Sequence, residues 1–205
     1  MSPLFVFDIL GTFAFAVYGA YVAQRKGFDV FGVAVCAFVS AVGGSTLRDG
    51  LFQRLPVYFF DSTYVIAILI GIVFSILVFH QFEKVQKFML WIDALGLVTF
   101  AFIGATKAFG FGLGLLGVIL FAVVSAVGGG IIRDLMVGEV PQIFYQDFYA
   151  TPAIILGIIY VLLQPWVYHW YVAYGIIVVV FILRLLAIKF RLQLWKPRVA
   201  ETGVV

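Results

Sequence analysis

Apolar residues gather along the chain into seven long runs, separated by short segments that hold most of the Lys, Arg and Pro residues. Each run has about the ~20 residues that an α-helix needs to cross a bilayer. The runs lack the strict alternation of a membrane β-barrel strand. The sequence therefore predicts an all-α integral membrane protein with seven transmembrane helices, at residues 3–23, 30–49, 62–80, 89–107, 113–134, 150–168 and 171–190.

The composition supports a lipid environment. Hydrophobic residues make up 64% of the 205 residues and charged residues 11%, and the mean hydropathy is +1.16. One soluble core of this length could not bury so much apolar surface. The first apolar run has no basic segment before it and no small-residue cleavage site after it. We therefore expect a retained helix and not a signal peptide.

Lys and Arg residues lie mainly on one side of the predicted bundle. Counted from the N-terminus, the even-numbered connections hold only Arg48, Arg54 and Lys107. The positive-inside rule then places the N-terminus outside and the C-terminus in the cytoplasm, for a multi-pass protein of the inner membrane. The net charge of +3 follows from this topology signal and does not indicate nucleic-acid binding. The basic residues of the cytoplasmic side are Arg25, Lys26, Lys84, Lys87, Arg133, Lys189, Arg191, Lys196 and Arg198.

One ten-residue segment occurs twice in the chain. Ser40-Ala-Val-Gly-Gly-Ser-Thr-Leu-Arg-Asp49 reappears 85 positions later as Ser125-Ala-Val-Gly-Gly-Gly-Ile-Ile-Arg-Asp134. Asp, Pro and many Gly residues also coincide at this offset, which indicates a duplication. We predict a first repeat over 1–84, a second over 85–169, and a seventh helix with a basic tail over 170–205. Matched residues outside the segment include Asp8 and Asp93, Gly19 and Gly104, Pro56 and Pro141, and Tyr64 and Tyr149.

Each predicted repeat holds three spans. Because three is an odd number, the second repeat must enter the membrane from the side opposite to the first, so the two repeats are inverted. Many transport proteins have this arrangement, with a site near the membrane midplane that discontinuous helices form. The seventh span has no counterpart, and we expect it to pack against the bundle or against a neighbouring subunit.

Glycine clusters occupy the middle of the second and fifth predicted spans, at Gly43-Gly44 and Gly128-Gly129-Gly130. Each glycine weakens a helix by about 1 kcal/mol relative to alanine. An unwound turn at membrane depth is tolerated where it lines a cavity. We predict that both helices are kinked at these glycines and line such a cavity. In the alternative interpretation the glycines only allow close helix packing.

An Arg-Asp pair follows each glycine cluster at membrane depth. An intramembrane arginine costs about 2.5–3.5 kcal/mol and usually faces the bundle interior with a partner, unless it reaches the interface by snorkelling. The predicted topology gives Asp8 the depth of Arg48, and Asp93 the depth of Arg133. We therefore predict two ion pairs, Asp8–Arg48 and Asp93–Arg133, on opposite sides of the midplane, with Asp49 and Asp134 nearby.

Helical spacing aligns a serine, a glycine and the arginine of each motif on one stripe. Hydroxyl groups and open carbonyls on that stripe could replace part of the hydration shell of a small cation, or hold a small zwitterion. Serines in membrane helices also commonly bond their own helix carbonyls. We predict a transient monovalent-cation site near Gly43, Gly44, Gly128 and Gly129. The predicted pore residues are Ser40, Gly43, Gly44, Ser45, Arg48, Asp49, Ser125, Gly128, Gly129, Gly130, Arg133 and Asp134, supported by Asp8 and Asp93.

The paired Gly-Gly-x-x-x-Arg-Asp segments, the three-plus-three repeat and the extra helix resemble the prokaryotic trimeric intracellular cation (TRIC) channels. The resemblance covers about residues 3–190. It implies homotrimers in which each protomer has its own pore, with the second and fifth helices kinked at the glycines, and conduction of monovalent cations, chiefly potassium. Bacterial relatives are also described as a glycine-transporter family, so the permeant species stays open.

Two departures limit the resemblance. Animal members have basic residues at the kinked helices where this chain has Ser45 and Gly130, so their regulation by lipid and calcium does not carry over. Lys107 stands opposite Val22 in the repeat and breaks the internal symmetry. It is either a gating or pore-mouth charge or a topology signal.

Other classes of function fit less well. An enzyme would need a nucleophile-base or metal constellation, but His80 and His169 lie at span ends and no HExxH motif is present. Cys36 is the only cysteine, which excludes a cysteine metal site. We expect no cofactor and no structural metal. A secondary transporter of a small zwitterion such as glycine is the alternative, although the near-symmetric motif favours a channel.

Overall fold

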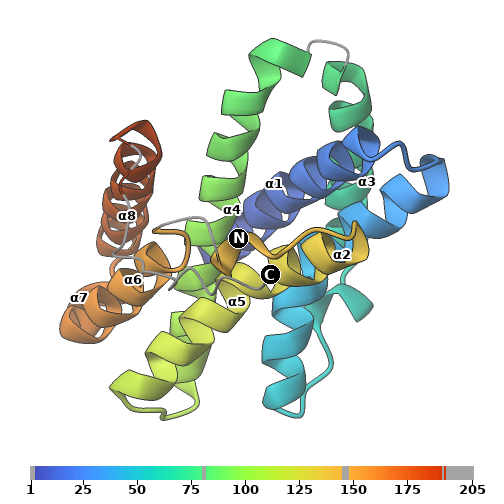
Figure 1. Cartoon of the computed structure of the whole chain (residues 1–205). Coiled ribbons are helices and arrows are strands. Elements are labelled where there is room, and N and C mark those ends of the chain that lie inside the picture. Colours follow the sequence, from blue (N-terminus) through green and yellow to red (C-terminus); the bar gives the residue numbers. More distant parts are fainter. Residues whose placement is uncertain (1–2, 80–81, 145–147, 191, 193–205) are drawn as a thin grey trace, which may run out of the picture.

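The computed structural model describes residues 3–79, 82–144, 148–190 and 192, and every regular element in these ranges is helical (Figure 1). The membrane helices of both repeats and the helix that follows them form one bundle, in which the helices from distant parts of the sequence lie side by side. The elements are α1 Pro3–Arg25, α2 Val30–Leu51, η1 Val57–Phe59, α3 Thr63–Phe79, α4 Phe82–Gly110, α5 Leu115–Met136, η2 Gln142–Phe144, α6 Thr151–Leu162, α7 Gln164–Val167 and α8 Trp170–Phe190.

Of the described helices, α1, α2, α4, α5 and α8 are long and apolar enough to cross a membrane, while α3 and α6 are apolar but shorter. Seven spans therefore stay a prediction. The sixth predicted span, 150–168, is divided into α6 and α7. Pro165 explains the division, because proline has no amide hydrogen and its ring clashes with the carbonyl four residues earlier.

The duplicated sequence folds into a duplicated backbone. Helices α2 and α5 each have 22 residues and begin and end at positions related by the sequence offset of 85. The 3-10 helices η1 and η2 are related in the same way. Left-handed φ angles also recur at matched positions, at Gly27 and Gly112 (74° and 78°) and at Gln53 and Gly138 (53° and 73°).

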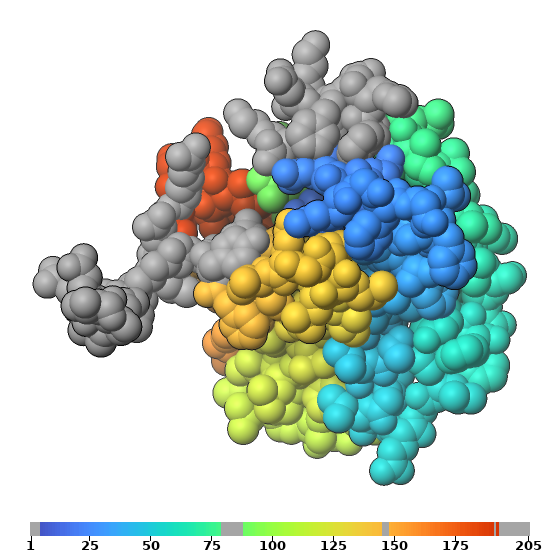
Figure 2. Space-filling view, turned by 45° about the vertical axis from the view of Figure 1, so that its right-hand side comes forward, coloured from blue at the N-terminus to red at the C-terminus, as the bar shows by residue number. Residues whose placement is uncertain are grey.

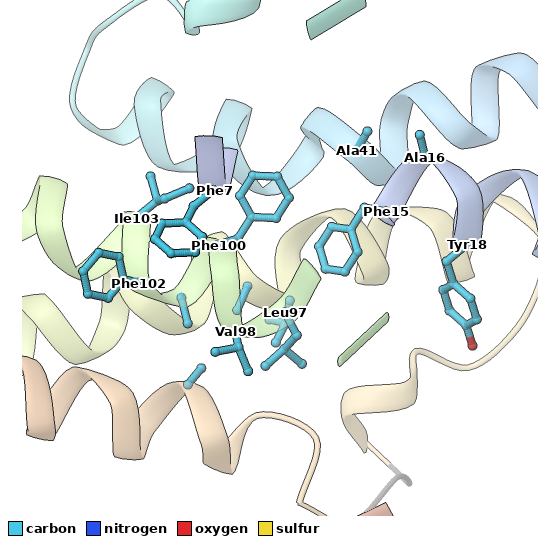
Figure 3. Packing of buried hydrophobic residues seen from close by; sticks show 14 of the residues in the cluster. Phe7, Phe15, Ala16, Tyr18, Ala41, Leu97, Val98, Phe100, Phe102 and Ile103 are labelled. Carbon is cyan, nitrogen blue, oxygen red and sulfur yellow. The ribbon is translucent and has the colours of Figure 1, made fainter. Parts of the chain in front are cut away.

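Equivalent residues of α1 and α4 meet in the core (Figure 3). The rings of Phe15 and Phe100, which are matched in the repeat, lie 5.3 Å apart between centroids. A Cβ atom added at Gly11 would meet Phe100, and one added at Gly96 would meet Phe15. Such reciprocal contacts between equivalent surfaces indicate a local two-fold axis that relates the repeats.

Contacts at the two ends of α2 and α5 show that these helices are antiparallel. Lys26, just before α2, forms an ion pair of 2.8 Å with Glu139, just after α5. Arg54, just after α2, lies over the ring of Phe111, just before α5, at 4.5 Å. Figure 2 shows the blue chain around the start of α2 against the yellow chain at the end of α5. The two-fold axis is therefore perpendicular to the helices, as inverted repeats require.

Helix α8 packs against α4 and α6 at the edge of the bundle, as expected for a helix without a counterpart (Figure 1). The boundaries of the repeats at residues 84 and 169 stay predictions. The sequence predictions for His80, Arg191, Lys196 and Arg198 lie outside the described residues, as do those for the side chains of Lys84 and Lys87.

Candidate functional site

Helices α2 and α5 cross at their duplicated glycines with backbone against backbone. A Cβ atom at Gly44 would collide with the carbonyl oxygen of Ser125, and one at Gly129 would collide with that of Ser40. These two contacts are equivalent under the sequence repeat. Only glycine fits at both positions, because the neighbouring atom is a backbone oxygen that no side-chain rotation can move.

The predicted unwound segments are absent. Helices α2 and α5 are continuous through Gly43-Gly44 and Gly128-Gly129-Gly130, so open carbonyls do not line this level. Tertiary packing overrides the low helix propensity of glycine here, and the close-packing interpretation holds for these residues. A kink of α2 and α5 at these glycines that leaves the helices continuous stays a prediction.

The two motif serines are packing residues in this structure. Ser40 and Ser125 are both 0% exposed. A Cβ atom at Gly19 of α1 would meet Ser40, and one at Gly104 of α4 would meet the hydroxyl of Ser125. Each serine is thus enclosed by glycines of neighbouring helices. Within the described residues, neither hydroxyl has a hydrogen-bond partner.

A buried group of polar side chains, the first charge layer, lies four residues beyond Gly44 and consists of Asp8, Arg48, Asp49 and Tyr64. The Arg48 guanidinium donates to both Asp49 oxygens, at 2.7 Å from Nε and 3.0 Å from Nη2. Lys107 Nζ adds contacts of 3.2 and 3.3 Å to the same oxygens. Tyr64 donates its hydroxyl hydrogen to Asp8 Oδ2 at 2.7 Å.

The predicted Asp8–Arg48 ion pair is wrong. Among the described residues Arg48 pairs only with Asp49, while Asp8 takes its hydrogen bond from Tyr64. Asp8 and Arg48 were expected to pair because they share a depth, but depth along a helix does not determine the direction in which a side chain points. The match of Tyr64 with Tyr149 in the repeat was a signal for this partner.

The second charge layer consists of Asp93, Arg133, Asp134 and Tyr149, the equivalents of the first. Arg133 is fully buried; its Nε donates to Asp134 Oδ1 at 2.9 Å, and its Nη2 lies 2.8 Å from the same oxygen. The predicted Asp93–Arg133 pair is confirmed, with 3.7 Å between Oδ1 and Nη1. Tyr149 donates to Asp93 at 3.4 Å. Because α2 and α5 are antiparallel, the two layers lie on opposite sides of the glycine contact.

Tyr18 and Gln142 contact the second layer. The Arg133 guanidinium lies over the ring of Tyr18, 4.5 Å from its centroid. Gln142 connects Asp134 with Tyr18: its backbone amide donates to Asp134 at 2.9 Å, and its side chain donates to the Tyr18 hydroxyl at 3.1 Å. Gly130 leaves room for the Tyr149 hydroxyl, which would lie 3.1 Å from a Cβ atom there.

Arg184 of α8 is a charged residue of this region that the sequence analysis missed. It is 1% exposed, donates from Nη1 to the Phe148 carbonyl at 2.9 Å, and lies over the Tyr149 ring at 5.1 Å. An arginine inside the predicted seventh span, several residues before its end, was the available signal, since intramembrane charges are rare and face the protein interior.

The two tyrosines provide a matched test of the layers. Tyr64→Phe removes the 2.7 Å bond to Asp8, whose carboxylate has no ion pair within 4.0 Å among the described residues. We expect a loss of about 1–3 kcal/mol of unfolding free energy. Tyr149→Phe is expected to cost less, because its bond is longer and Asp93 keeps Arg133. Thermal unfolding in detergent measures both, and equal losses would contradict the asymmetry.

Solved structures resemble this fold along nearly its whole length. A protein described in terms of conductance through TRIC cation channels is 31% identical, with a TM-score of 0.88 over 98% of this chain and 100% of its own. The trimeric intracellular cation channel orthologue from Rhodobacter sphaeroides is 34% identical, with a TM-score of 0.85 over 94% and 100%. These relatives are ion channels and not enzymes.

The family's sequence model, described as "Glycine transporter", matches the chain twice, at residues 5–80 and 90–165. The chain belongs to this TRIC family. A membrane protein of Deinococcus radiodurans is 42% identical over 149 residues, 71% of this chain and 69% of the relative. The inner membrane protein YadS of Escherichia coli is 39% identical over 155 residues, 75% of each. This TRIC chain is accordingly a multi-pass membrane protein.

In this TRIC chain the Lys26–Glu139 ion pair joins one end of α2 and α5, and the contact of Arg54 with the Phe111 ring joins the other. The contribution of the ion pair to stability should depend on salt concentration. Reversing one charge, with Lys26→Glu or Glu139→Lys, is expected to lower the unfolding temperature at low salt, by the equivalent of about 0–1 kcal/mol for an exposed pair. The double reversal restores it. At ~1 M salt, where the Debye length is about 3 Å, the differences should vanish. Differences that persist there would exclude an ionic contact.

Proposed function

We propose that this protein is a channel for monovalent cations, chiefly potassium, with a separate pathway in each protomer of a homotrimer. The observation that carries the proposal is the pair of buried charge layers, one on each side of the α2–α5 contact. Charges at membrane depth occur where they pair or line a polar pathway. The solved relatives described as cation channels support the sign of the permeant ion.

The proposed pathway is lined by α2 and α5 and is closed at the glycine contact in this conformation. The helices touch there through backbone atoms, so an ion passes only when they separate. Hydroxyl groups of Ser45 and Thr46 both bond the Val42 carbonyl, at 2.8 and 2.7 Å, just before the glycines. Such bonds bend helices and support a kink at this level. The transient cation site near Gly43 and Gly129 belongs to the open form.

We also propose that the protein lies in the inner membrane with its N-terminus outside and its C-terminus in the cytoplasm. The distribution of Lys and Arg between the connections supports this orientation. The description of the Escherichia coli relative as an inner membrane protein supports the location. A cysteine introduced at exposed Asp29 is expected to react with an impermeant thiol reagent only after cell lysis, since the α1–α2 connection is cytoplasmic.

Flux through liposomes that contain only this protein tests the function. We expect potassium flux without a coupled gradient, and unitary current steps in planar bilayers. Asp49→Asn removes the partner that Arg48 and Lys107 share, and Arg133→Ala removes the centre of the second layer. Both variants are expected to lose most of the potassium flux.

Asp29→Asn is the matched control for the carboxylate change. Asp29 is exposed and caps α2 by accepting from the Gly32 amide at 2.7 Å, and asparagine caps helices as well as aspartate does. Its flux should equal that of the wild type. Wild-type flux in both Asp49→Asn and Arg133→Ala would reject the two charge layers as the ion pathway.

Transport of glycine is the alternative function, and one observation favours it. Among the described residues, buried guanidinium nitrogens of Arg48 and Arg133 lack hydrogen bonds of good geometry, although Arg133 lies near two carboxylates. A guanidinium beside a carboxylate could hold both ends of a zwitterion. Saturable, steeply temperature-dependent glycine uptake without unitary current steps would establish this alternative and replace the channel proposal.

A further inference from the structure

The two charge layers receive the same set of charges from their own repeats. Each repeat contributes two carboxylates and one guanidinium, which leaves one negative charge in excess when all are ionised. An excess charge at membrane depth is unfavourable unless a cation balances it. Each layer has such a cation from outside the symmetric set. Lys107 of α4 contacts the first layer, and Arg184 of α8 contacts the second.

Arg184 is buried against the second layer. Its side chain is buried, and its guanidinium both donates to the Phe148 carbonyl at 2.9 Å and lies over the Tyr149 ring at 5.1 Å. The Tyr149 hydroxyl in turn contacts Asp93. The Arg184 charge therefore acts on Asp93 across one aromatic ring, and both side chains are buried, where charges interact more strongly than in water.

The backbone of the second repeat departs from the first where Arg184 binds. Thr63 begins α3, whereas its equivalent Phe148 has a φ of 59° and α6 begins only at Thr151. A left-handed conformation is unfavourable for a residue with a side chain, so surrounding contacts must maintain it. The bond from Arg184 to the Phe148 carbonyl is one of these contacts. Arg184 therefore contacts the second repeat at the point where its backbone departs from that of the first.

The balancing cation of the first layer is different in kind. The Lys107 side chain is 31% exposed and holds Asp49 through one ammonium group on a flexible stem. Water can replace that contact, and its field is screened accordingly. Lys107 therefore serves as the comparison for Arg184, because it brings the same charge to the equivalent layer but is partly exposed to solvent and contacts a carboxylate directly.

We propose that Arg184 is the fixed counter-charge of the second charge layer and determines how strongly that layer selects cations over anions. This inference rests on the proposed channel function. With Arg184 present the layer is electroneutral, so a passing cation meets no net attraction there. Without its charge the layer carries one negative charge, attracts cations and excludes anions more strongly. The role of α8 within the protomer is to bring this charge to the layer.

Reversal potentials in a potassium chloride gradient test the proposal. Arg184→Gln keeps a donor for the Phe148 carbonyl but removes the charge, and its reversal potential should shift toward the potassium equilibrium potential by a several-fold rise in the permeability ratio. Arg184→Lys should stay close to the wild type. Asp93→Asn should shift the potential in the opposite direction, and the double variant Asp93→Asn with Arg184→Gln should return to the wild-type value. Lys107→Gln should shift it less than Arg184→Gln.

Each remaining outcome decides the matter. A folded Arg184→Gln protein with the wild-type reversal potential would overturn the proposal. If Arg184→Gln does not fold, folding of the double variant supports a counter-charge, and failure of both shows a packing residue instead. If the wild type passes no current, the channel function fails separately. The unfolding temperatures of Asp93→Asn, Arg184→Gln and the double variant then test the counter-charge. Losses that are not additive indicate that Arg184 balances the charge of Asp93, and additive losses exclude it.

Discussion

Alanine at Gly44 or Gly129 is expected to lower the free energy of unfolding by about 1–3 kcal/mol or more and to remove ion flux. The added methyl group would occupy the position of a backbone carbonyl oxygen in the opposite helix, Ser125 for Gly44 and Ser40 for Gly129. A clash with backbone cannot be relieved by a rotamer change, so α2 and α5 must move apart along their whole contact. The charge layers on both sides of the crossing would move with them.

Gly50→Ala is the control within α2 for this prediction. A Cβ atom there meets nothing within 4 Å, and alanine favours the helix by about 1 kcal/mol relative to glycine. Gly50→Ala should therefore be neutral or stabilising, while Gly44→Ala is strongly destabilising. Unfolding temperature in detergent and potassium flux in liposomes measure both effects. If Gly44→Ala and Gly129→Ala keep wild-type stability, the helices do not meet as closely as the structure shows.

The duplication explains why so much of the fold follows from the sequence alone. An ungapped offset of 85 residues carries the ends of α2 onto those of α5, η1 onto η2, and the left-handed residues Gly27 and Gln53 onto Gly112 and Gly138. Gln53 has a left-handed φ, as Gly138 does, although it is not a glycine. The backbone conformation at this position is therefore kept in both repeats although the residue type differs.

The state of the duplicated glycines was not decided by the sequence, because local propensity and tertiary packing oppose each other there. Propensity predicted a break, whereas backbone contact between Gly44 and Gly129 and their partners keeps both helices whole. The break in the predicted sixth span has a local cause, Pro165. The prediction of one continuous span rested on the length of the apolar run and did not take this proline into account. Hydrophobic length predicts a span but not its continuity.

The charge layers show a second limit. Topology placed each aspartate at the depth of an arginine; Asp93 and Arg133 do pair, whereas Asp8 and Arg48 do not. Rotation about the helix axis, which decides between such partners, depends on packing. Two cations that differ between the layers are Lys107, whose equivalent in the repeat is the apolar Val22, and Arg184, which lies outside the repeats, so symmetry could not predict their contacts.

Removing the Arg133 charge is expected to have the largest effect of any single change in the charge layers. Arg133→Gln leaves Asp93 and Asp134 without the guanidinium that lies 3.7 and 2.8 Å from their oxygens. Loss of one partner from a buried ion pair costs about 3–5 kcal/mol, and we expect poor folding and no flux. Arg48→Gln leaves Lys107 beside Asp49 and is expected to cost less.

Double-mutant cycles distinguish Asp93–Arg133, which are in contact, from Asp8–Arg48, which are not. In the second layer, Asp93→Asn should partly rescue Arg133→Gln, with a coupling of about 0.5–3 kcal/mol between contacting residues. In the first layer the cycle of Asp8→Asn with Arg48→Gln should show a smaller coupling, because Tyr64 and not Arg48 contacts Asp8. Equal coupling in the two layers would mean that Asp8 and Arg48 do pair in the membrane. The layers would then be symmetric in their Asp–Arg pairs, while still differing in Lys107 and Arg184.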